Sequence, residues 1–251
     1  MTGKLYIDLG NSRIKWMREN RQGCSSMQAA DYKKASLRDT FAAAWKMSDR
    51  PEQVWVASVA DRAVEEALAA WLTKAWGLSP QVMKVTAACC GLTCGYEQPQ
   101  QLGVDRWAAM IAAYRSCPDG VCVVDCGTAV TLDVVNSRGQ HLGGYILPGV
   151  KTMQRALLQN TAIEMQRHGI DASREWGDST ASCIELGTGK SIVALIEQSI
   201  ERMQAAGICD PGLILTGGEV ELIEPLMQID YQRRDALVLE GIRLYAREHS
   251  S

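Results

Sequence analysis

The spacing of apolar residues divides the first half of the chain into an ordered series of strands and helices. Residues 4–10 read KLYIDLG, an apolar run that ends at a glycine, and the alternating segment RIKWMR follows almost at once. Two strand-like segments on either side of a short turn predict a β-hairpin. Later apolar residues recur every three or four positions, which predicts helices. In order, the elements predicted for this half are strands over 4–10 and 13–18, a helix over 36–47 with Ser36 as N-cap, a strand over 53–59, a helix over 62–76 closed by Gly77, a strand over 81–85, a loop over 86–101 and a helix over 104–116.

The same pattern restarts at residue 120. GVCVVDCG is typical of a strand, and AVTLDVVN is its expected hairpin partner. A Gly-Thr-Gly interruption at 187–189 is expected to mark a break between two helices. In order, the elements predicted for this half are strands over 120–127, 129–136 and 141–149, a helix over 150–160, an irregular segment over 160–178, helical structure over 179–207, a strand over 212–219 and a helix over 236–249.

Each half therefore opens with a β-hairpin and continues with alternating helices and strands, which indicates an α/β fold built twice. Asp8 and Asp125 fall at the same place in the two halves, and each is followed two residues later by glycine. A repeat of this length is typical of a duplicated domain rather than a solenoid array. We expect an N-terminal half over 1–118 and a C-terminal half over 119–251, with the closing helix free to pack back on the first half.

Composition narrows the function classes. The formal net charge of the 251 residues is −3, which disfavours a nucleic-acid or membrane-surface protein because these usually carry a basic patch. The opening MTGKLYID lacks the apolar core of a signal peptide, and no apolar run is long enough to cross a bilayer. We therefore expect a soluble, cytoplasmic protein with no nucleic-acid or membrane partner.

Cysteine and histidine spacing gives no metal-binding pattern. The nine cysteines are odd in number and irregularly spaced, which favours reduced thiols in a cytosolic chain. Cys90 and Cys94 stand four apart, but neither a second cysteine pair nor a histidine pair lies nearby in the sequence. His141, His168 and His249 are scattered. This spacing disfavours a structural zinc site.

The two Asp-x-Gly turns suggest a phosphate site. A glycine turn between strands exposes backbone N–H groups, which suit an anion such as phosphate. A carboxylate beside that anion would repel it unless a cation lies between them, so the pattern points to a metal–phosphate complex. The alternative is a plain tight hairpin, since Asp and Gly are ordinary turn residues. Two matched copies and the glycine exit of the strand ending at Thr216 favour nucleotide binding.

These motifs resemble the actin-like ATPase superfamily, and within it the type III pantothenate kinase family. The segments that carry the resemblance are DLGNSRIKW, LGVDRWAA, DCGTAVTLDVV, GGYILPG and LTGGE, in that order from Asp8 to Glu219. The resemblance implies a duplicated actin-like, or ribonuclease H-like, α/β fold with two similar halves around a nucleotide cleft. Ser12 stands where the family usually has threonine, and it keeps the hydroxyl.

Asp105 is our candidate for the catalytic base. Phosphoryl transfer to a primary alcohol needs a group that accepts the hydroxyl proton, and a helix N-terminus favours an ionised carboxylate. From the residues alone, an ordinary helix acid beside a solvated Arg106 fits equally well, whereas the family pattern makes Asp105 the base. The resemblance also implies that Arg106 binds the pantothenate carboxylate, for which a planar guanidinium is suited.

The remaining roles follow from the turns and the resemblance together. Asp8 is expected to hold Mg²⁺, directly or through water, and Lys15 to lie near the transferred charge, or else on a solvated strand face. The resemblance makes Asp125 the ligand of a monovalent cation, K⁺ or NH4⁺. The resemblance places Tyr96 in the pantothenate pocket, and the alternative is a loop aromatic packed on the surface. It makes Thr180 a substrate contact, and the alternative is an N-cap of the following helix, a role that can hold at the same time. The residues assigned to the nucleotide are Asp8, Gly10, Asn11, Ser12, Lys15, Gly127, Thr128, Gly217 and Gly218. Those assigned to pantothenate are Tyr96, Gly103, Val104, Asp105, Arg106 and Thr180.

The resemblance implies ATP-dependent phosphorylation of pantothenate to 4′-phosphopantothenate, the first step of coenzyme A biosynthesis, by a homodimer. One alternative is another small actin-like kinase or phosphatase, which would keep Asp8 and Asp125 but give Asp105 no special place. The other is a non-catalytic transcriptional accessory protein, which the acidic balance and the presence of Asp105 both oppose.

Overall fold

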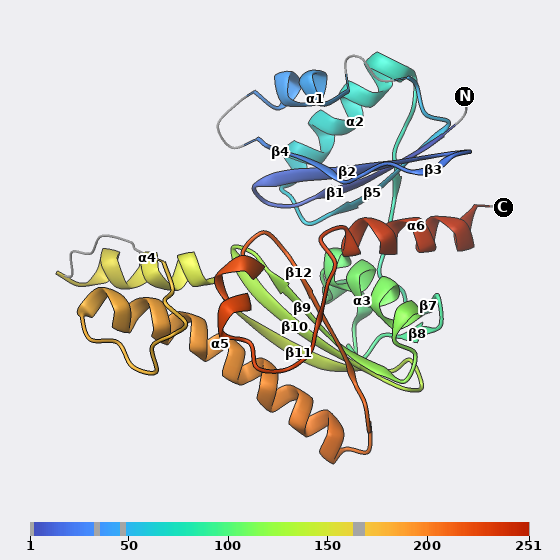
Figure 1. Cartoon of the computed structure of the whole chain (residues 1–251). Coiled ribbons are helices and arrows are strands. Elements are labelled where there is room, and N and C mark those ends of the chain that lie inside the picture. The colour runs from blue at the N-terminus through green and yellow to red at the C-terminus, as the bar shows by residue number, and fades with distance from the viewer. Residues whose placement is uncertain (1–2, 33–35, 46–48, 163–168, 251) are drawn as a thin grey trace. The chain divides into compact units, whose positions relative to one another are not determined.

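The computed structural model describes residues 3–32, 36–45, 49–162 and 169–250 of the chain. Contacts along and across the chain divide it into two compact units. The first unit contains residues 1–113 and 236–251, and the second contains residues 114–235. The closing helix α6 therefore belongs to the first unit, and the whole second unit is inserted ahead of it (Figure 1).

The first unit is built on a six-stranded sheet. Its strand order is β3-β2-β1-β5-β6, and β4 also pairs with β2. The pairs β1–β2, β2–β3 and β2–β4 are antiparallel, whereas β1–β5 and β5–β6 are parallel. The strands are β1 Lys4–Leu9, β2 Arg13–Asn20, β3 Gly23–Cys24, β4 Gln28–Asp31, β5 Gln53–Ser58 and β6 Gln81–Val82.

Helices of the first unit bury an aromatic cluster against this sheet. The helices are α1 Leu37–Trp45, α2 Arg62–Trp76, α3 Val104–Ser116, which crosses into the second unit, and α6 Leu237–His249. Trp45 is 1% exposed and its ring packs against Phe41, Trp71 and Trp76, with centroid separations of 5.8, 5.3 and 6.0 Å. Aromatic pairs at these separations contribute beyond the area they bury, so this cluster ties α1 to α2.

Helix α6 makes a close backbone contact with α3. A Cβ built on Gly241 would lie 1.8 Å from the carbonyl oxygen of Ala108. Only glycine leaves room for two helices to approach this closely. Residue 241 therefore fixes how α6 packs inside the first unit.

A polar cluster fastens α6 to the sheet. Glu19 on β2 accepts a hydrogen bond from the Tyr6 hydroxyl and one from Arg247 of α6, whose Nη2 lies 2.6 Å from Glu19 Oε1. Burial raises the pKa of Glu19, but the hydrogen bonds from Tyr6 and Arg247 outweigh this effect and hold the pKa below its usual value. Glu19 is therefore ionised in the folded protein at neutral pH.

Several predicted elements of the first unit differ from those observed. The strand predicted over 81–85 contains only Gln81–Val82. The loop predicted over 86–101 holds a small hairpin, β7 Ala88–Cys89 with β8 Leu92–Thr93, and the 3₁₀ turn η1 Pro99–Gln101. Two-residue strands are too short to show an alternating pattern. The helix predicted over 36–47 is α1 as far as Trp45, and residues 46–47 lie outside the described residues.

The second unit repeats the core of the first. Its sheet has the order β11-β10-β9-β12-β13. β9 pairs antiparallel with β10 and parallel with β12, as β1 pairs antiparallel with β2 and parallel with β5. The predicted duplicated α/β fold is therefore confirmed. The elements are β9 Gly120–Cys126, β10 Ala129–Asn136, β11 His141–Pro148, α4 Val150–Asn160, α5 Thr180–Ala205, β12 Gly212–Thr216, η2 Val220–Leu222, η3 Glu224–Leu226 and β13 Gln232–Arg233.

The helix break predicted at 187–189 is wrong, because α5 runs unbroken from Thr180 to Ala205. Thr188 is buried, and its Oγ1 donates to the carbonyl oxygen of Ile184 at 2.8 Å. A Cβ on Gly189 would lie 2.7 Å from both Ile170 Cδ1 and Leu226 Cδ1. Gly189 therefore lets other segments pack closely on an intact helix.

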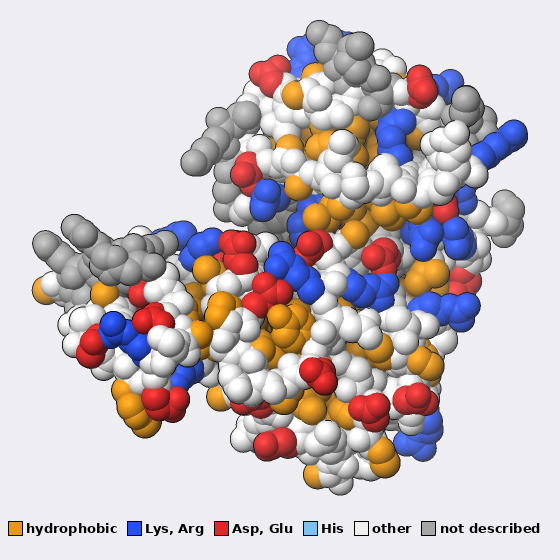
Figure 2. All heavy atoms as spheres, viewed as in Figure 1, with side chains coloured by type: hydrophobic (Ala, Val, Ile, Leu, Met, Phe, Trp, Pro, Cys, Tyr) orange, Lys and Arg blue, Asp and Glu red, His pale blue; other side chains and the backbone are white. Residues whose placement is uncertain are grey.

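The helices of the described residues and the surface drawn in Figure 2 bear on the expectations from charge and hydropathy. Among the described residues, no helix combines the length and apolarity needed to cross a bilayer. On the face in Figure 2, acidic and basic side chains are interspersed.

His141 is buried on β11, with Nε2 2.9 Å from Asp133 Oδ1, and His168 lies outside the described residues.

Candidate active site

In the first unit, the first Asp-x-Gly hairpin brings Asp8 and Lys15 together. The β1–β2 register places them directly opposite each other, with Lys15 Nζ 4.0 Å from Asp8 Oδ2. Asp8 is 8% exposed and Lys15 is partly buried. A carboxylate that leaves water needs a cation or hydrogen-bond donors beside it, and Lys15 supplies part of that charge. The alternative of a fully solvated Lys15 does not hold.

The turn that joins the two strands is closed by glycine. Gly10 N donates to the carbonyl oxygen of Arg13 at 3.0 Å, which leaves Asn11 and Ser12 at the tip. The Tyr32 hydroxyl donates to the carbonyl oxygen of Gly10. Burial, helped by the charges of Asp61 and Asp8, raises the pKa of Tyr32, so this hydroxyl keeps its proton. Tyr32 is a supporting residue that the sequence did not reveal.

Also in the first unit, Tyr96 and Arg106 form a pair. Arg106 Nη1 donates to the Tyr96 hydroxyl at 3.1 Å, and the guanidinium carbon lies 5.9 Å from the centre of the Tyr96 ring. Arg106 is 7% exposed. A buried guanidinium needs hydrogen-bond acceptors, and it favours carboxylates because two donors can meet two oxygens. The solvated Arg106 considered above is therefore excluded.

Asp105 occupies the second position of α3. Its Oδ1 accepts a hydrogen bond from the backbone N–H of Arg106 at 2.8 Å. A Cβ on Gly103 would lie 2.6 Å from the same oxygen, so the glycine makes room for this carboxylate. The partly exposed side chain is thus oriented by the helix start, where the helix dipole favours its ionised form.

A surface pocket opens beside Gly103 and Val104. It is lined on its other sides by residues that include Ser58, Lys84 and Gln101. These side chains supply a hydroxyl, an ammonium and an amide, which suit a small polar ligand. The predicted residues Gly103 and Val104 therefore border a cavity of the first unit.

In the second unit, the second Asp-x-Gly hairpin packs against the start of α4. Gly127 N donates to the carbonyl oxygen of Ala129 at 3.0 Å and closes the turn after Asp125. Gly149 N donates to the carbonyl oxygen of Thr128 at 2.9 Å, and a Cβ on Gly149 would lie 2.0 Å from the Gly127 oxygen. The last glycine of GGYILPG therefore sets the N-terminus of α4 beside the turn, where helix amides favour anions.

The glycine exit of β12 reaches the same turn. Gly217 has φ of +102°, and a Cβ there would lie 2.3 Å from the Cys126 carbonyl oxygen and 2.4 Å from Asp125 Oδ1. Glu219 N donates to the Cys126 carbonyl oxygen at 2.8 Å. The structure thus brings Gly127, Gly217 and Asp125 together, and Gly218 follows on the exposed side.

Glu219 and Lys151 were not assigned a role from the sequence. Glu219 Oε1 lies 4.0 Å from Lys151 Nζ, and the backbone N of Lys151 lies 3.4 Å from Glu219 Oε2. Burial, followed by the charges of Asp125 and Glu219, raises the pKa of the Cys126 thiol to about 12. Two carboxylates therefore concentrate negative charge at this strand end. The available signal was the position of Glu219 directly after Thr-Gly-Gly.

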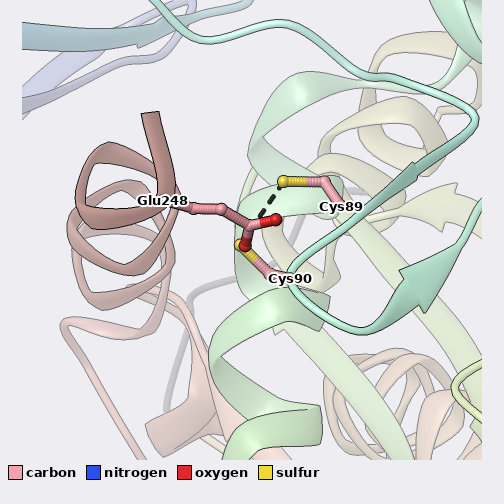
Figure 3. A group of neighbouring side chains, drawn as sticks. All are labelled: Cys89, Cys90 and Glu248. Atoms are coloured by element: carbon pink, nitrogen blue, oxygen red, sulfur yellow. Dashed lines mark hydrogen bonds between the residues drawn. The ribbon is translucent and has the colours of Figure 1, made fainter. Parts of the chain in front are cut away.

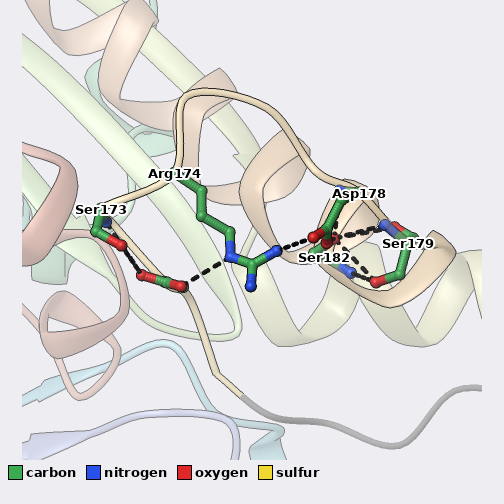
Figure 4. A network of polar contacts seen from close by, with 6 residues as sticks. Ser173, Arg174, Asp178, Ser179 and Ser182 are labelled. Atoms are coloured by element: carbon green, nitrogen blue, oxygen red, sulfur yellow. Dashed lines mark hydrogen bonds and ion pairs between the residues drawn. The ribbon is translucent and has the colours of Figure 1, made fainter.

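Thr180 begins α5, but Ser179 caps it. Ser182 N donates to Ser179 Oγ at 3.2 Å, and Ser182 Oγ accepts from Ser179 N at 3.0 Å, which forms a capping box. Arg174 bridges the preceding loop, with Nε 2.9 Å from Asp171 Oδ2 and an ion pair to Asp178 (Figure 4). The N-cap role considered for Thr180 is therefore wrong by one residue, because Ser179 is the N-cap. The side chain of Thr180 is exposed and can contact a ligand.

Known proteins place the chain in a family. A family model for type III pantothenate kinase matches residues 4–202. The chain belongs to the type III pantothenate kinase family. A type III pantothenate kinase of Halorhodospira halophila is 36% identical over 98% of this chain and 99% of its own length. One of Nitrosococcus oceani is 32% identical over 98% of this chain and 94% of its own.

Solved structures confirm the actin-like fold. MreB5 of Spiroplasma citri bound to AMPPNP has a TM-score of 0.55 and 12% identity over 100% of this chain and 97% of its own. An ROK hexokinase of Thermus thermophilus has a TM-score of 0.51 and 13% identity over 99% of each chain. A Campylobacter jejuni chain described as a Baf family transcriptional activator has a TM-score of 0.65 and 20% identity over 98% of each chain. At these identities the likeness concerns the fold.

Proposed function

We propose that this protein transfers the γ-phosphoryl group of ATP to pantothenate and forms 4′-phosphopantothenate, which begins coenzyme A biosynthesis. The proposal rests on the Gly-x-Asp-Arg element of this chain, which belongs to the family. Arg106 of this element is buried and bonded to Tyr96, and Asp105 lies beside it in the sequence. A general actin-like kinase or phosphatase would not need this arrangement. The transcriptional alternative is not favoured, since the family match and the Asp105–Arg106 element both point to a kinase.

Asp105 accepts the proton in this reaction. As the hydroxyl oxygen of pantothenate attacks the γ-phosphorus, its O–H bond breaks and the proton passes to the carboxylate. The bond from the γ-phosphorus to the β,γ-bridging oxygen breaks, and ADP leaves with that oxygen. The hydrogen bond from the Arg106 amide orients Asp105, and this positioning is the main contribution a protein makes to phosphoryl transfer.

Arg106 recognises the substrate carboxylate. Its guanidinium is buried, and Tyr96 holds one Nη1 donor at 3.1 Å, which restricts the orientation of the guanidinium plane. A fixed planar fork selects a carboxylate over a neutral amide or alcohol. Thr180 is proposed as a further substrate contact, and Gly103 and Val104 as the walls of the pocket beside Asp105.

The glycine turns bind the phosphates of ATP. In the first unit this assigns Gly10, Asn11, Ser12 and Lys15, and in the second Gly127, Thr128, Gly217 and Gly218. Asp8 fits Mg²⁺, because its largely buried carboxylate offers hard oxygen donors beside a lysine. The metal would neutralise the phosphate charge when bound. Lys15 adds a second positive charge for the transferred group.

Asp125 is proposed as a ligand of K⁺ or NH4⁺. The carboxylates of Asp125 and Glu219 both raise the pKa of the buried Cys126, so they add negative charge at the turn assigned to phosphate. Carboxylates and phosphate oxygens carry the same sign of charge, so placing them close together costs free energy unless a cation lies between them. A cation held by Asp125 would reduce this repulsion and tighten ATP binding. A homodimer in the cytoplasm completes the proposal, on the family resemblance.

A coupled ADP-release assay tests the activity. Purified protein is incubated with ATP and Mg²⁺, with pantothenate present or omitted and with KCl replaced by an organic cation chloride. We expect ADP release to require pantothenate and to rise with K⁺, and mass spectrometry to detect 4′-phosphopantothenate. Pantothenate-independent ADP release, or no phosphorylated product, would contradict the proposal.

A further inference from the structure

Two adjacent thiols lie together on the small hairpin of the first unit. Cys89 ends β7 and is 8% exposed, and Cys90 begins the turn to β8. Their Sγ atoms are 3.4 Å apart. The next cysteine, Cys94, belongs to the same loop but not to this cluster.

The turn that brings these thiols together has an unusual residue in it. Cys90 and Gly91 have φ of +53° and +81°, as in a two-residue hairpin turn that favours asparagine or glycine. Among the described residues, Cys90 is the one non-glycine residue with a positive φ. Left-handed backbone at such a residue often marks a functional site.

A carboxylate from a segment far away in the sequence, but in the same unit, joins the two thiols. Glu248 lies on the last turn of α6, and Figure 3 shows its carboxylate directed at the two thiols. The two Sγ atoms and a carboxylate oxygen all lie within 4.8 Å of one another. No spacing rule could find this group, because its third member is far away in the sequence.

The donor set matches a soft divalent ion. Two thiolates held at about 2.3 Å by one tetrahedral ion lie about 3.8 Å apart. The observed separation of 3.4 Å needs only a small adjustment. Two sulfurs and one oxygen leave the fourth position of a tetrahedral ion to water, and sulfur selects zinc-class metals over Mg²⁺.

We propose that Cys89, Cys90 and Glu248 form a binding site for a zinc-class divalent cation. The bound ion cross-links the β7–β8 hairpin to α6. The site is separate from the Mg²⁺ and K⁺ sites assigned to the kinase reaction, and its effect is on the stability of the first unit.

Metal titration of the full chain tests this site. The protein is reduced, stripped with a chelator and titrated with Zn²⁺ against a chromophoric competitor, and with Cd²⁺ by thiolate-to-metal absorption. We expect one equivalent to bind and, at free zinc about 100-fold above Kd, the melting temperature to rise by about 5–10 °C. Mg²⁺ should produce neither signal. Absence of zinc-dependent binding in the wild type would overturn the proposal.

Three variants locate the ion. Cys90→Gly removes one thiol but suits the left-handed turn, so the metal-free variant should melt at or above the metal-free wild type while losing the zinc response. Glu248→Gln should keep the dithiolate absorption with Cd²⁺ but bind Zn²⁺ at least about tenfold more weakly. Cys94→Ser is the matched control and should behave as the wild type. A full zinc response in Cys90→Gly, unchanged zinc affinity in Glu248→Gln, or loss of the response in Cys94→Ser would refute the three-ligand site.

Discussion

Replacing Gly217 by alanine should damage both the fold and the nucleotide site of the second unit. The φ of +102° disfavours any residue with a Cβ, at a cost of about 1–2 kcal/mol. The added methyl would lie 2.3 Å from the Cys126 carbonyl oxygen and 2.4 Å from Asp125 Oδ1. Cys126 belongs to β9, which is bonded on both sides, so relief of the clash adds about 1–3 kcal/mol. The expected loss is about 2–5 kcal/mol.

Gly207→Ala is the matched control for this substitution. Gly207 also has a positive φ, +89°, but a Cβ there meets no atom within 4 Å. It should therefore lose only the conformational part, about 1–2 kcal/mol. Thermal unfolding and denaturant titration compare the free energies of unfolding, and calorimetry measures ATP affinity. We expect Gly217→Ala to be the less stable variant and to bind ATP at least about tenfold more weakly. Equal stability of the two variants, with ATP affinity intact in both, would refute the packing argument.

Four further predictions concern catalysis and pH. Asp105→Asn should lower turnover about 10²–10⁴-fold with an unchanged melting temperature, and near-normal turnover would exclude Asp105 as base. Arg106→Lys should weaken pantothenate binding more than binding of the neutral analogue pantothenol, measured by calorimetry, whereas equal losses would mean that Arg106 does not read the carboxylate. Asp125→Asn should abolish most of the K⁺ activation seen in a KCl titration at constant ionic strength, and full activation would remove Asp125 as a ligand. The depressed pKa of Glu19 stabilises the fold above the unfolded pKa of about 4.3, and this contribution is lost as pH falls through the folded pKa. Glu19→Gln should therefore be less stable than the wild type at pH 7, with a gap that narrows below about pH 4, and a pH-independent gap would contradict this.

The hairpins of the two units could be predicted because each pairs a long apolar strand with a long partner across a short glycine turn. β1 and β9 are buried along almost their whole length and read as continuous apolar runs, whereas β2 and β10, of eight residues each, mix buried with partly or fully exposed positions. The β7–β8 hairpin has only two residues a strand and gives no such pattern. The helix break predicted at 187–189 was wrong because Gly189 allows other segments to pack closely on the helix and does not end it.

The site residues were predictable as motifs but not as contacts. Nothing in the spacing of Tyr96 and Arg106 indicates that their side chains meet, and the family pattern alone named both. Glu219 directly follows Thr-Gly-Gly in the sequence, but only the structure shows that its carboxylate lies near Lys151. Three-dimensional proximity between segments far apart in sequence carries no periodic signal.

The insertion of the second unit ahead of α6 has a consequence for synthesis on the ribosome. Residues 114–235 must all be translated between the first 113 residues and the helix that completes their unit. At about 5–20 residues per second, this interval lasts roughly 6–25 s. During it the β1–β2 surface that α6 covers, including Glu19, has no partner from that helix. The first unit therefore cannot be completed until the whole second unit has been translated.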